Sequence, residues 1–194
     1  MILLNIPIIT ERKKKLQETI SIVGTAGRRP TSDLCTKELF DKAYNACANK
    51  ISILVPLPED RILVSGGAAV IDHIAVKMFL YGFAPKLILH LPAKFENGAF
   101  TGSRDAETSN YYHRLMKSRS GIDGLADIDR AIRLGAVISV SDGFFARNNM
   151  VANSKHIIAE TFSTTDDTPA DGGTLHTWNK SKSTSKHHIN LYNV

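Results

Sequence analysis

Three glycine-containing segments carry the residues of this chain that are best suited to chemistry. They are Gly24-Thr25-Ala26-Gly27, Ser65-Gly66-Gly67 and Gly172-Gly173-Thr174. Each is predicted to lie between a strand and a helix. Glycine lets the backbone approach a phosphate closely, and a helix N-terminus offers free N–H groups and about half a positive charge. One such segment alone is explained by ordinary turn geometry, but the three together predict a phosphate-binding site.

The segments between these turns predict the elements that position them. Apolar runs predict strands, and apolar residues at helical spacing predict helices. The predicted strands are 20–23, 61–64, 86–91, 136–140, 156–159 and 189–192, and the predicted helices are 31–50, 68–81, 123–134, 143–153 and 173–180. The first of these helices begins at Thr31 or Ser32, either of which can cap it. This alternation predicts an α/β fold, a Rossmann-like doubly wound, mainly parallel sheet with helices on both faces, whose turns meet at the ligand-binding edge.

The composition is that of an ordinary folded protein. The 194 residues are 43% hydrophobic and 22% charged. We expect one domain over 1–194, with an N-terminal arm at 1–18 and a polar insertion at about 93–120 that holds a short helix near 111–117. The net charge of +5 is compatible with a polyanionic partner. The chain shows no membrane-spanning run and no signal-peptide pattern, which predicts a cytoplasmic protein without a membrane partner.

The predicted insertion contains a candidate binding surface, and the two cysteines indicate the redox state of the protein. Tyr111 and Tyr112, with Arg114, Lys117 and Arg119, combine stacking and charge as single-strand binders do, but core packing of one tyrosine and solvation of the charges also explain them. Cys35 and Cys47 are predicted on one helix and turned away from each other, which predicts reduced thiols.

Several common functions are excluded by spacing. The dinucleotide fingerprint lacks its third glycine and its acidic residue, and the P-loop pattern is absent, so dehydrogenase and NTPase functions are not expected. The seven histidines lack metal-ligand spacing. The sequence therefore predicts neither a metal site nor a cofactor.

The order of three motifs resembles the DNA-processing protein A (DprA/Smf) family. The resemblance extends over about residues 20–160 and connects the chain to the SLOG superfamily, which includes the LOG-type cytokinin-activating phosphoribohydrolases. Its motifs are Ile22-Val23-Gly24-Thr25 with Arg28-Arg29-Pro30, Leu63 to Asp72 with Ala75, and Phe144, Ala146, Arg147 and Asn148 with Ala152.

The resemblance implies a phosphate pocket and a function. The implied pocket residues are Gly24, Arg28, Ser65, Gly66, Gly67, Arg147 and Asn148. In DprA proteins this pocket binds single-stranded DNA, and the protein helps to load a RecA-type recombinase; SLOG-type folds commonly self-associate, which implies a homo-oligomer. On chemical grounds, the planar fork of Arg147 suits a phosphate. Without the resemblance a surface salt bridge would be the better explanation of that arginine, and with it phosphate binding is favoured.

One sequence position indicates whether the chain resembles the enzymes of the superfamily. LOG-type hydrolases place a catalytic glutamate three residues beyond the threonine of a glycine-threonine turn, and here Thr177 stands at that position after Thr174. The remaining candidate carboxylates are Glu160, which an exposed strand end explains, and Asp72, which the dipole of its helix explains. The leading hypothesis is a DprA-like nucleotide or single-stranded DNA binder without covalent catalysis. A nucleoside-monophosphate N-glycosidase and a nucleotide-signal sensor are the alternatives.

Overall fold

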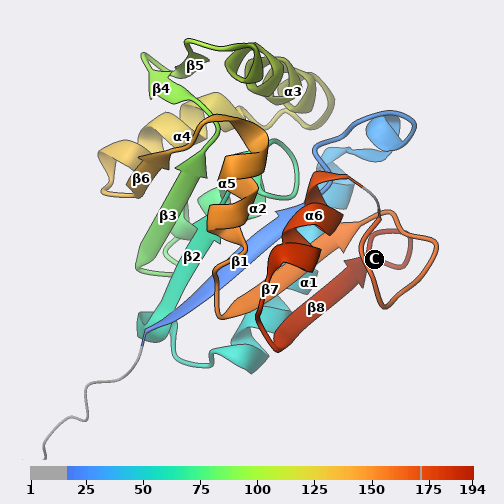
Figure 1. Cartoon of the computed structure of the whole chain (residues 1–194). Coiled ribbons are helices and arrows are strands. Elements are labelled where there is room, and N and C mark those ends of the chain that lie inside the picture. Colours follow the sequence, from blue (N-terminus) through green and yellow to red (C-terminus); the bar gives the residue numbers. More distant parts are fainter. Residues whose placement is uncertain (1–16, 171) are drawn as a thin grey trace, which may run out of the picture.

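The computed structural model describes residues 17–170 and 172–194, and it shows a six-stranded parallel sheet flanked by helices (Figure 1). The strand order is β6-β3-β2-β1-β7-β8. The strands are β1 (Glu18–Gly24), β2 (Arg61–Ser65), β3 (Lys86–Leu91), β6 (Val137–Val140), β7 (His156–Thr161) and β8 (Ser185–Asn190). The predicted Rossmann-like α/β fold is confirmed. Most of the predicted N-terminal arm, residues 1–16, lies outside the described residues.

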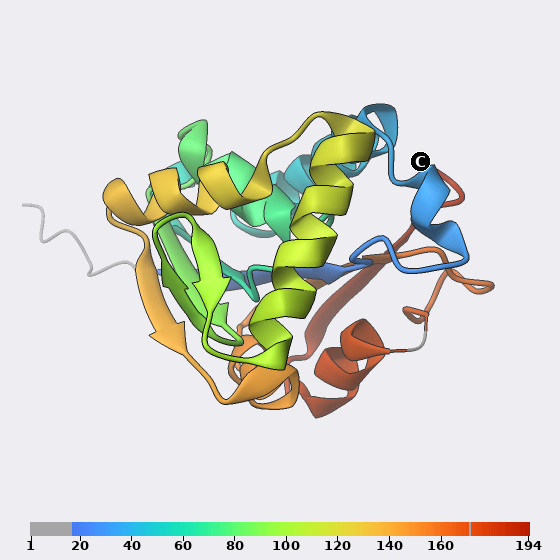
Figure 2. The same cartoon turned by 90° about the horizontal axis from the view of Figure 1, so that it is seen from above.

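Helices cover both faces of the sheet (Figure 2). One side carries α1 (Lys37–Leu54), α2 (His73–Leu80), α3 (Arg104–Ser120) and α4 (Gly124–Arg133), and the other carries α5 (Gly143–Val151) and α6 (Gly173–Lys180). The central strand β1 places apolar side chains on both faces of the sheet. Ile20 and Ile22 are buried in the larger core under α1 and α2, while Val23 is buried in the smaller core under α5 and α6. None of the described helices is long and apolar enough to cross a membrane.

Two helices begin later than the sequence predicts. Residues Thr31–Leu34 form a 3-10 turn, η1, and α1 begins at Lys37 because the hydroxyl of Thr36 accepts the backbone N–H of Leu39 at 3.2 Å. Cys35 therefore precedes the helix, although both thiols are free and buried. Helix α2 begins at His73 rather than at 68, because Val70 has a left-handed backbone with φ of 65° that no helix accommodates.

The insertion is regular, so the prediction of an irregular segment with a short helix is wrong. It consists of an antiparallel hairpin, β4 (Lys94–Glu96) and β5 (Ala99–Thr101), followed by the 17-residue helix α3. Asn97 and Gly98 form the hairpin turn, and both have positive φ, the backbone that a two-residue turn of this kind requires. The hydroxyl of Ser103 accepts the N–H of Ala106 at the start of α3, and Gly121 ends the helix with φ of 74°.

A buried histidine pair joins α2, α3 and α4. The Nε2–H of His113 donates to the carbonyl of Gly67 at 3.0 Å, and His73 Nε2 lies 3.0 Å from a carboxylate oxygen of Asp127. The two rings lie 5.9 Å apart, and both side chains are almost completely buried. Burial lowers the pKa of His113 to about 4 and also lowers the pKa of His73.

We predict that acid destabilises the fold through this pair. A histidine with a lowered folded-state pKa stabilises the protein fully above its unfolded value of about 6.5, and this contribution is lost as the pH falls toward 4. For His113 the loss amounts to up to about 3 kcal/mol over that range. Urea unfolding between pH 7 and pH 5 should therefore show a smaller loss of stability in His113→Gln, which keeps a donor for Gly67, than in the wild type. Equal losses in the two proteins would show that His113 does not cause the effect.

Candidate functional site

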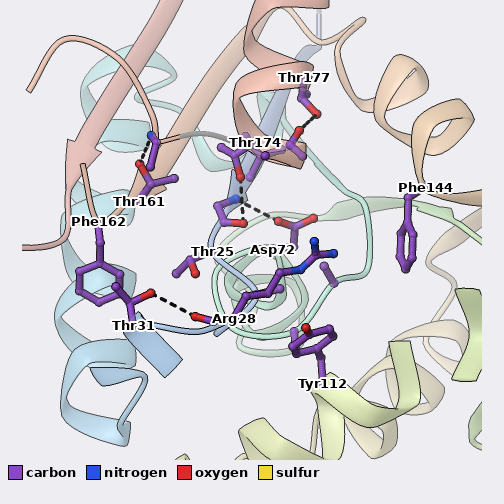
Figure 3. A pocket seen from close by; sticks show the side chains of 18 of the residues that line it. Thr25, Arg28, Thr31, Asp72, Tyr112, Phe144, Thr161, Phe162, Thr174 and Thr177 are labelled. Atoms are coloured by element: carbon purple, nitrogen blue, oxygen red, sulfur yellow. Dashed lines mark hydrogen bonds between the residues drawn. The ribbon is translucent and has the colours of Figure 1, made fainter. Parts of the chain in front are cut away.

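A pocket of about 420 Å³ opens at the carboxyl edge of the sheet (Figure 3). Its wall is built from the ends of β1 and β7, the turns that follow them, the segment before α2, and residues of α3, α5 and α6. Ligands of open α/β sheets bind at this edge. Of the predicted phosphate-site residues, the wall contains Gly24, Thr25, Arg28, Arg147, Asn148, Gly172, Gly173 and Thr174.

Asp72 lies in the pocket wall and is nearly fully buried. Its Oδ1 accepts the backbone N–H of Gly24 and its Oδ2 accepts Nη1–H of Arg147, both at 3.0 Å. Burial raises the pKa of Asp72, and the charge of Arg147 and the Gly24 hydrogen bond offset part of this rise. Asp72 precedes α2 but makes no capping bond to it, so its interactions are those of a buried ion pair.

Gly24 lies where three elements meet. Its carbonyl accepts the hydroxyl of Thr174 at 3.0 Å, so the start of α6 is tied to the end of β1. A Cβ at this position would overlap the carbonyl oxygen of Glu160 and the side chain of Ile71. Glycine is therefore required here by close packing of the backbone, and Thr25 continues the contact by donating its N–H to Glu160 O at 3.1 Å.

The N-terminus of α6 faces the pocket. Gly172 precedes the helix with φ of 107°, and Gly173 and Thr174 form its first turn. The first turn of a helix leaves N–H groups without partners inside the helix and carries a partial positive charge, which favours an anion. Thr177, at the position of the hydrolase glutamate, is buried and donates its hydroxyl to the carbonyl of Gly173 at 3.0 Å. It holds the helix start and offers no carboxylate.

Arg28 and Arg29 supply the positive charge of the rim. Both are exposed, and neither forms an ion pair within the part of the chain that the structure describes. The guanidinium of Arg28 lies over the ring of Tyr112, 5.5 Å from its centre. Arg147, by contrast, is only 8% exposed and is paired with Asp72. Arg147 is thus a buried, paired residue of the pocket wall, whereas Arg28 and Arg29 line the same pocket with exposed side chains.

Ser65, Gly66 and Gly67 are buried and do not line the pocket; they lie behind Asp72 and Arg147, which do. The hydroxyl of Ser65 donates to the carbonyl of Asp72 at 2.8 Å and accepts the N–H of Gly67. A Cβ on Gly66 would overlap the guanidinium of Arg147. This turn therefore positions Asp72 and Arg147, and the direct phosphate contact predicted for it has no support in this arrangement.

Glu160 is not the solvated residue at a strand end that its position suggests. It is fully buried, it does not line the pocket, and neither carboxylate oxygen has a hydrogen-bond partner among the described residues. Burial raises its pKa well above the ordinary range, which favours the neutral acid. Its side chain adjoins Cys47 in the core, and its backbone carbonyl is the part that serves the site.

Sequence reasoning missed part of the wall. Phe162 and Tyr192 contribute aromatic rings to the pocket, and their ring centres lie 5.0 Å apart. Ser109 also lines it from α3. The only available signal was the aromatic stretch at 111–112, which includes the lining residue Tyr112. No group of His, Cys, Asp or Glu side chains within residues 17–170 and 172–194 could hold a metal ion.

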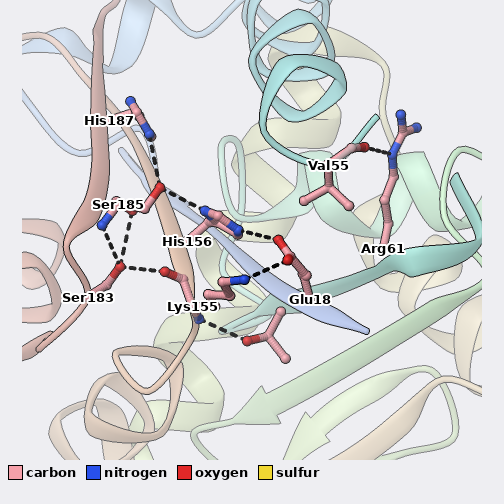
Figure 4. A network of polar contacts seen from close by, with 9 residues as sticks. Glu18, Val55, Arg61, Lys155, His156, Ser183, Ser185 and His187 are labelled. Atoms are coloured by element: carbon pink, nitrogen blue, oxygen red, sulfur yellow. Dashed lines mark hydrogen bonds and ion pairs between the residues drawn. The ribbon is translucent and has the colours of Figure 1, made fainter. Parts of the chain in front are cut away.

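A second polar network closes the opposite edge of the sheet (Figure 4). His156, at the start of β7, contacts Glu18 of β1 through Nε2 and Ser185 of β8 through Nδ1, each at 2.7 Å. Lys155 also pairs with Glu18, and Ser185 lies 3.2 Å from His187 Nε2. These contacts join the amino ends of three neighbouring strands. They lie outside the pocket wall, so they hold the sheet together far from the site.

Comparison with known proteins finds a viral relative. The uncharacterized protein R261 of Acanthamoeba polyphaga mimivirus is 38% identical to this chain over 176 residues, which cover 89% of this chain and 95% of the viral protein. No family model matches the chain, and no solved structure matches it significantly.

We predict that Asp72→Asn destabilises the protein by about 3–5 kcal/mol, because the buried guanidinium of Arg147 then lacks its carboxylate. The asparagine oxygen can still accept the Gly24 N–H, so the effect isolates the ion pair. The matched control is Asp33→Asn, which breaks an exposed pair with Arg119 and should cost less than about 1 kcal/mol. Chemical denaturation of both variants measures the difference, and similar small losses would contradict the importance of the buried pair.

Proposed function

We propose that this chain, which belongs to the same family as the mimivirus protein R261, binds a nucleotide through its phosphate group at the carboxyl edge of the sheet. One observation carries the proposal. The glycine turn after β1, the N-terminus of α6 and the unpaired Arg28 and Arg29 all line a single pocket. Its volume of about 420 Å³ falls within the range of small-molecule sites.

Single-stranded DNA is the form of this ligand that the resemblance to DprA proteins favours. A second cavity of about 480 Å³ lies along the same edge, and its wall contains the exposed cations Lys94 and Arg104 together with the acids Asp105 and Asp142. The two cavities are neighbours, because Gly143 lines one and Phe144 lines the other. A strand that places one nucleotide in the main pocket could continue into this cavity. Interaction with a RecA-type recombinase and self-association are further proposals from the same resemblance.

Cleavage of a nucleoside monophosphate is the weaker alternative. N-glycoside cleavage needs an acid or nucleophile near the ribose. In the pocket Asp72 is already held by Gly24 and Arg147, Glu160 is absent from the wall, and Thr177 replaces the glutamate. Signal sensing by nucleotide binding without turnover requires no such group.

We predict that Arg28→Ala weakens binding of a labelled single-stranded oligonucleotide by about ten-fold or more, because a charge-assisted phosphate contact is lost. The salt dependence should also become shallower. Fluorescence anisotropy at two salt concentrations, with nucleoside monophosphates as competitors, measures both effects. The matched control is Arg133→Ala, which removes the same charge from α4, where Arg133 pairs with Asp129. An equal loss in both variants would point to net charge rather than to this pocket.

We also predict that incubation with a panel of nucleoside monophosphates releases no free base, as chromatography would show. Stabilisation against heat by the same compounds is expected, because a ligand that binds only the folded state raises its stability. Release of free base would instead establish the hydrolase alternative. Thermal stabilisation by free nucleotides without any oligonucleotide binding would favour the sensor.

A further inference from the structure

Helix α3 is fixed over the turns that end at the pocket. His113 donates to Gly67 O, and Nη1 of Arg119 donates to Ser32 O at 2.6 Å. These two contacts lie near the middle and the end of the helix and reach the loops that follow β2 and β1. A helix held at both places presents the residues of its inner face at a defined position relative to the phosphate-binding turns.

Two residues of that inner face, Ser109 and Tyr112, line the pocket one helical turn apart. Tyr112 is half-buried, and its ring lies at the pocket beside Arg28 (Figure 3). The hydroxyl of Ser109 has no hydrogen-bond partner among residues 17–170 and 172–194. An aromatic face with a free hydroxyl beside it suits a flat ring that carries polar atoms on its edge.

The other aromatic side chains of the wall are engaged within the protein. Phe162 packs against Tyr192 with ring centres 5.0 Å apart, and Phe144 lies beneath the guanidinium of Arg147. The ring of Tyr112 packs edge to face with that of Tyr111, with ring centres 5.2 Å apart, and it also contacts Arg28, which is exposed and carries no ion pair in the described chain. Arg28 can therefore move to a phosphate while a ring of the ligand takes its place on Tyr112.

We propose that α3 recognises the base of the bound nucleotide, with Tyr112 stacking on the nucleobase and Ser109 contacting its edge. This inference rests on the proposed function and narrows its ligand class. The ligand is a nucleoside phosphate, free or within a single strand, and not a sugar phosphate. Stacking of a base on an aromatic side chain is largely independent of base identity, so discrimination between bases comes from Ser109.

The test compares adenosine monophosphate with ribose 5-phosphate, which share the phosphate and the sugar and differ by the base. Isothermal titration of the wild type should show adenosine monophosphate binding about ten-fold tighter or more. Tyr112→Leu should reduce this preference to about two-fold or less, and Tyr112→Phe should retain it. The control is Tyr81→Leu, an exposed tyrosine at the C-terminal end of α2 that packs on Tyr44 and does not line the pocket. Thermal unfolding of each variant establishes that it is folded.

A second comparison, of a single-stranded tetranucleotide with its abasic counterpart, distinguishes a base within a strand from the base of a free nucleotide. If the pocket binds a base that belongs to a strand, the wild type should bind the abasic strand more weakly than the tetranucleotide, whereas Tyr112→Leu should bind the two strands equally. Ser109→Ala should alter the order of affinities among the four nucleoside monophosphates.

Equal binding of adenosine monophosphate and ribose 5-phosphate by the wild type would overturn the role of α3 and leave the phosphate site intact. An unchanged preference in Tyr112→Leu would do the same. Absence of binding by every phosphate compound and strand would overturn the proposed function itself, so the two failures are distinguishable.

Discussion

The carboxylate of Asp72 holds together the edge of the sheet on which the site is built. It binds Gly24 and Arg147, which lie 48 and 75 residues away in the chain. A buried charge costs several kcal/mol unless it is paired and hydrogen-bonded, so these three segments are stable only when they are assembled together. Gly24 then positions Thr174 and α6, and Gly66 makes room for the guanidinium. The turn after β1, α5 and α6 thus take their places from one interaction.

The two edges of the sheet differ in how their polar side chains are paired. At the amino edge, Glu18, His156 and Ser185 satisfy one another across three strands. At the carboxyl edge, Arg28 and Arg29 form no ion pair with any residue that the structure describes, and the N-terminus of α6 lines the pocket. Because the starts of these strands are already joined by hydrogen bonds, the sheet tolerates unsatisfied polar groups at its opposite edge. Unsatisfied or strained groups are commonly found at functional sites.

The sequence predicts what depends on local pattern. Apolar runs located five of the six strands of the sheet, whereas the last strand, β8, lies at Ser185–Asn190 and not at the predicted 189–192. Glycines after strands located Gly24 and Gly172 in the pocket wall. It does not predict what depends on distant partners. The left-handed backbone at Val70 accompanies an N–H bond to Met116 in α3, and the burial of Glu160 follows from its register beside Gly24. Helix α3 was underestimated because several of its buried positions are polar, so its apolar periodicity is weak.

The pocket wall extends in sequence from Val23 to Tyr192, almost the full length of the described chain. No partly folded form that lacks β7, β8 or the last turn can therefore present the complete site. A ligand that fits it binds the finished molecule only, and at one hundred times its Kd it adds about 2.7 kcal/mol to the stability of the whole fold. The fraction of molecules that bind such a ligand is thus also a measure of the fraction that is completely folded.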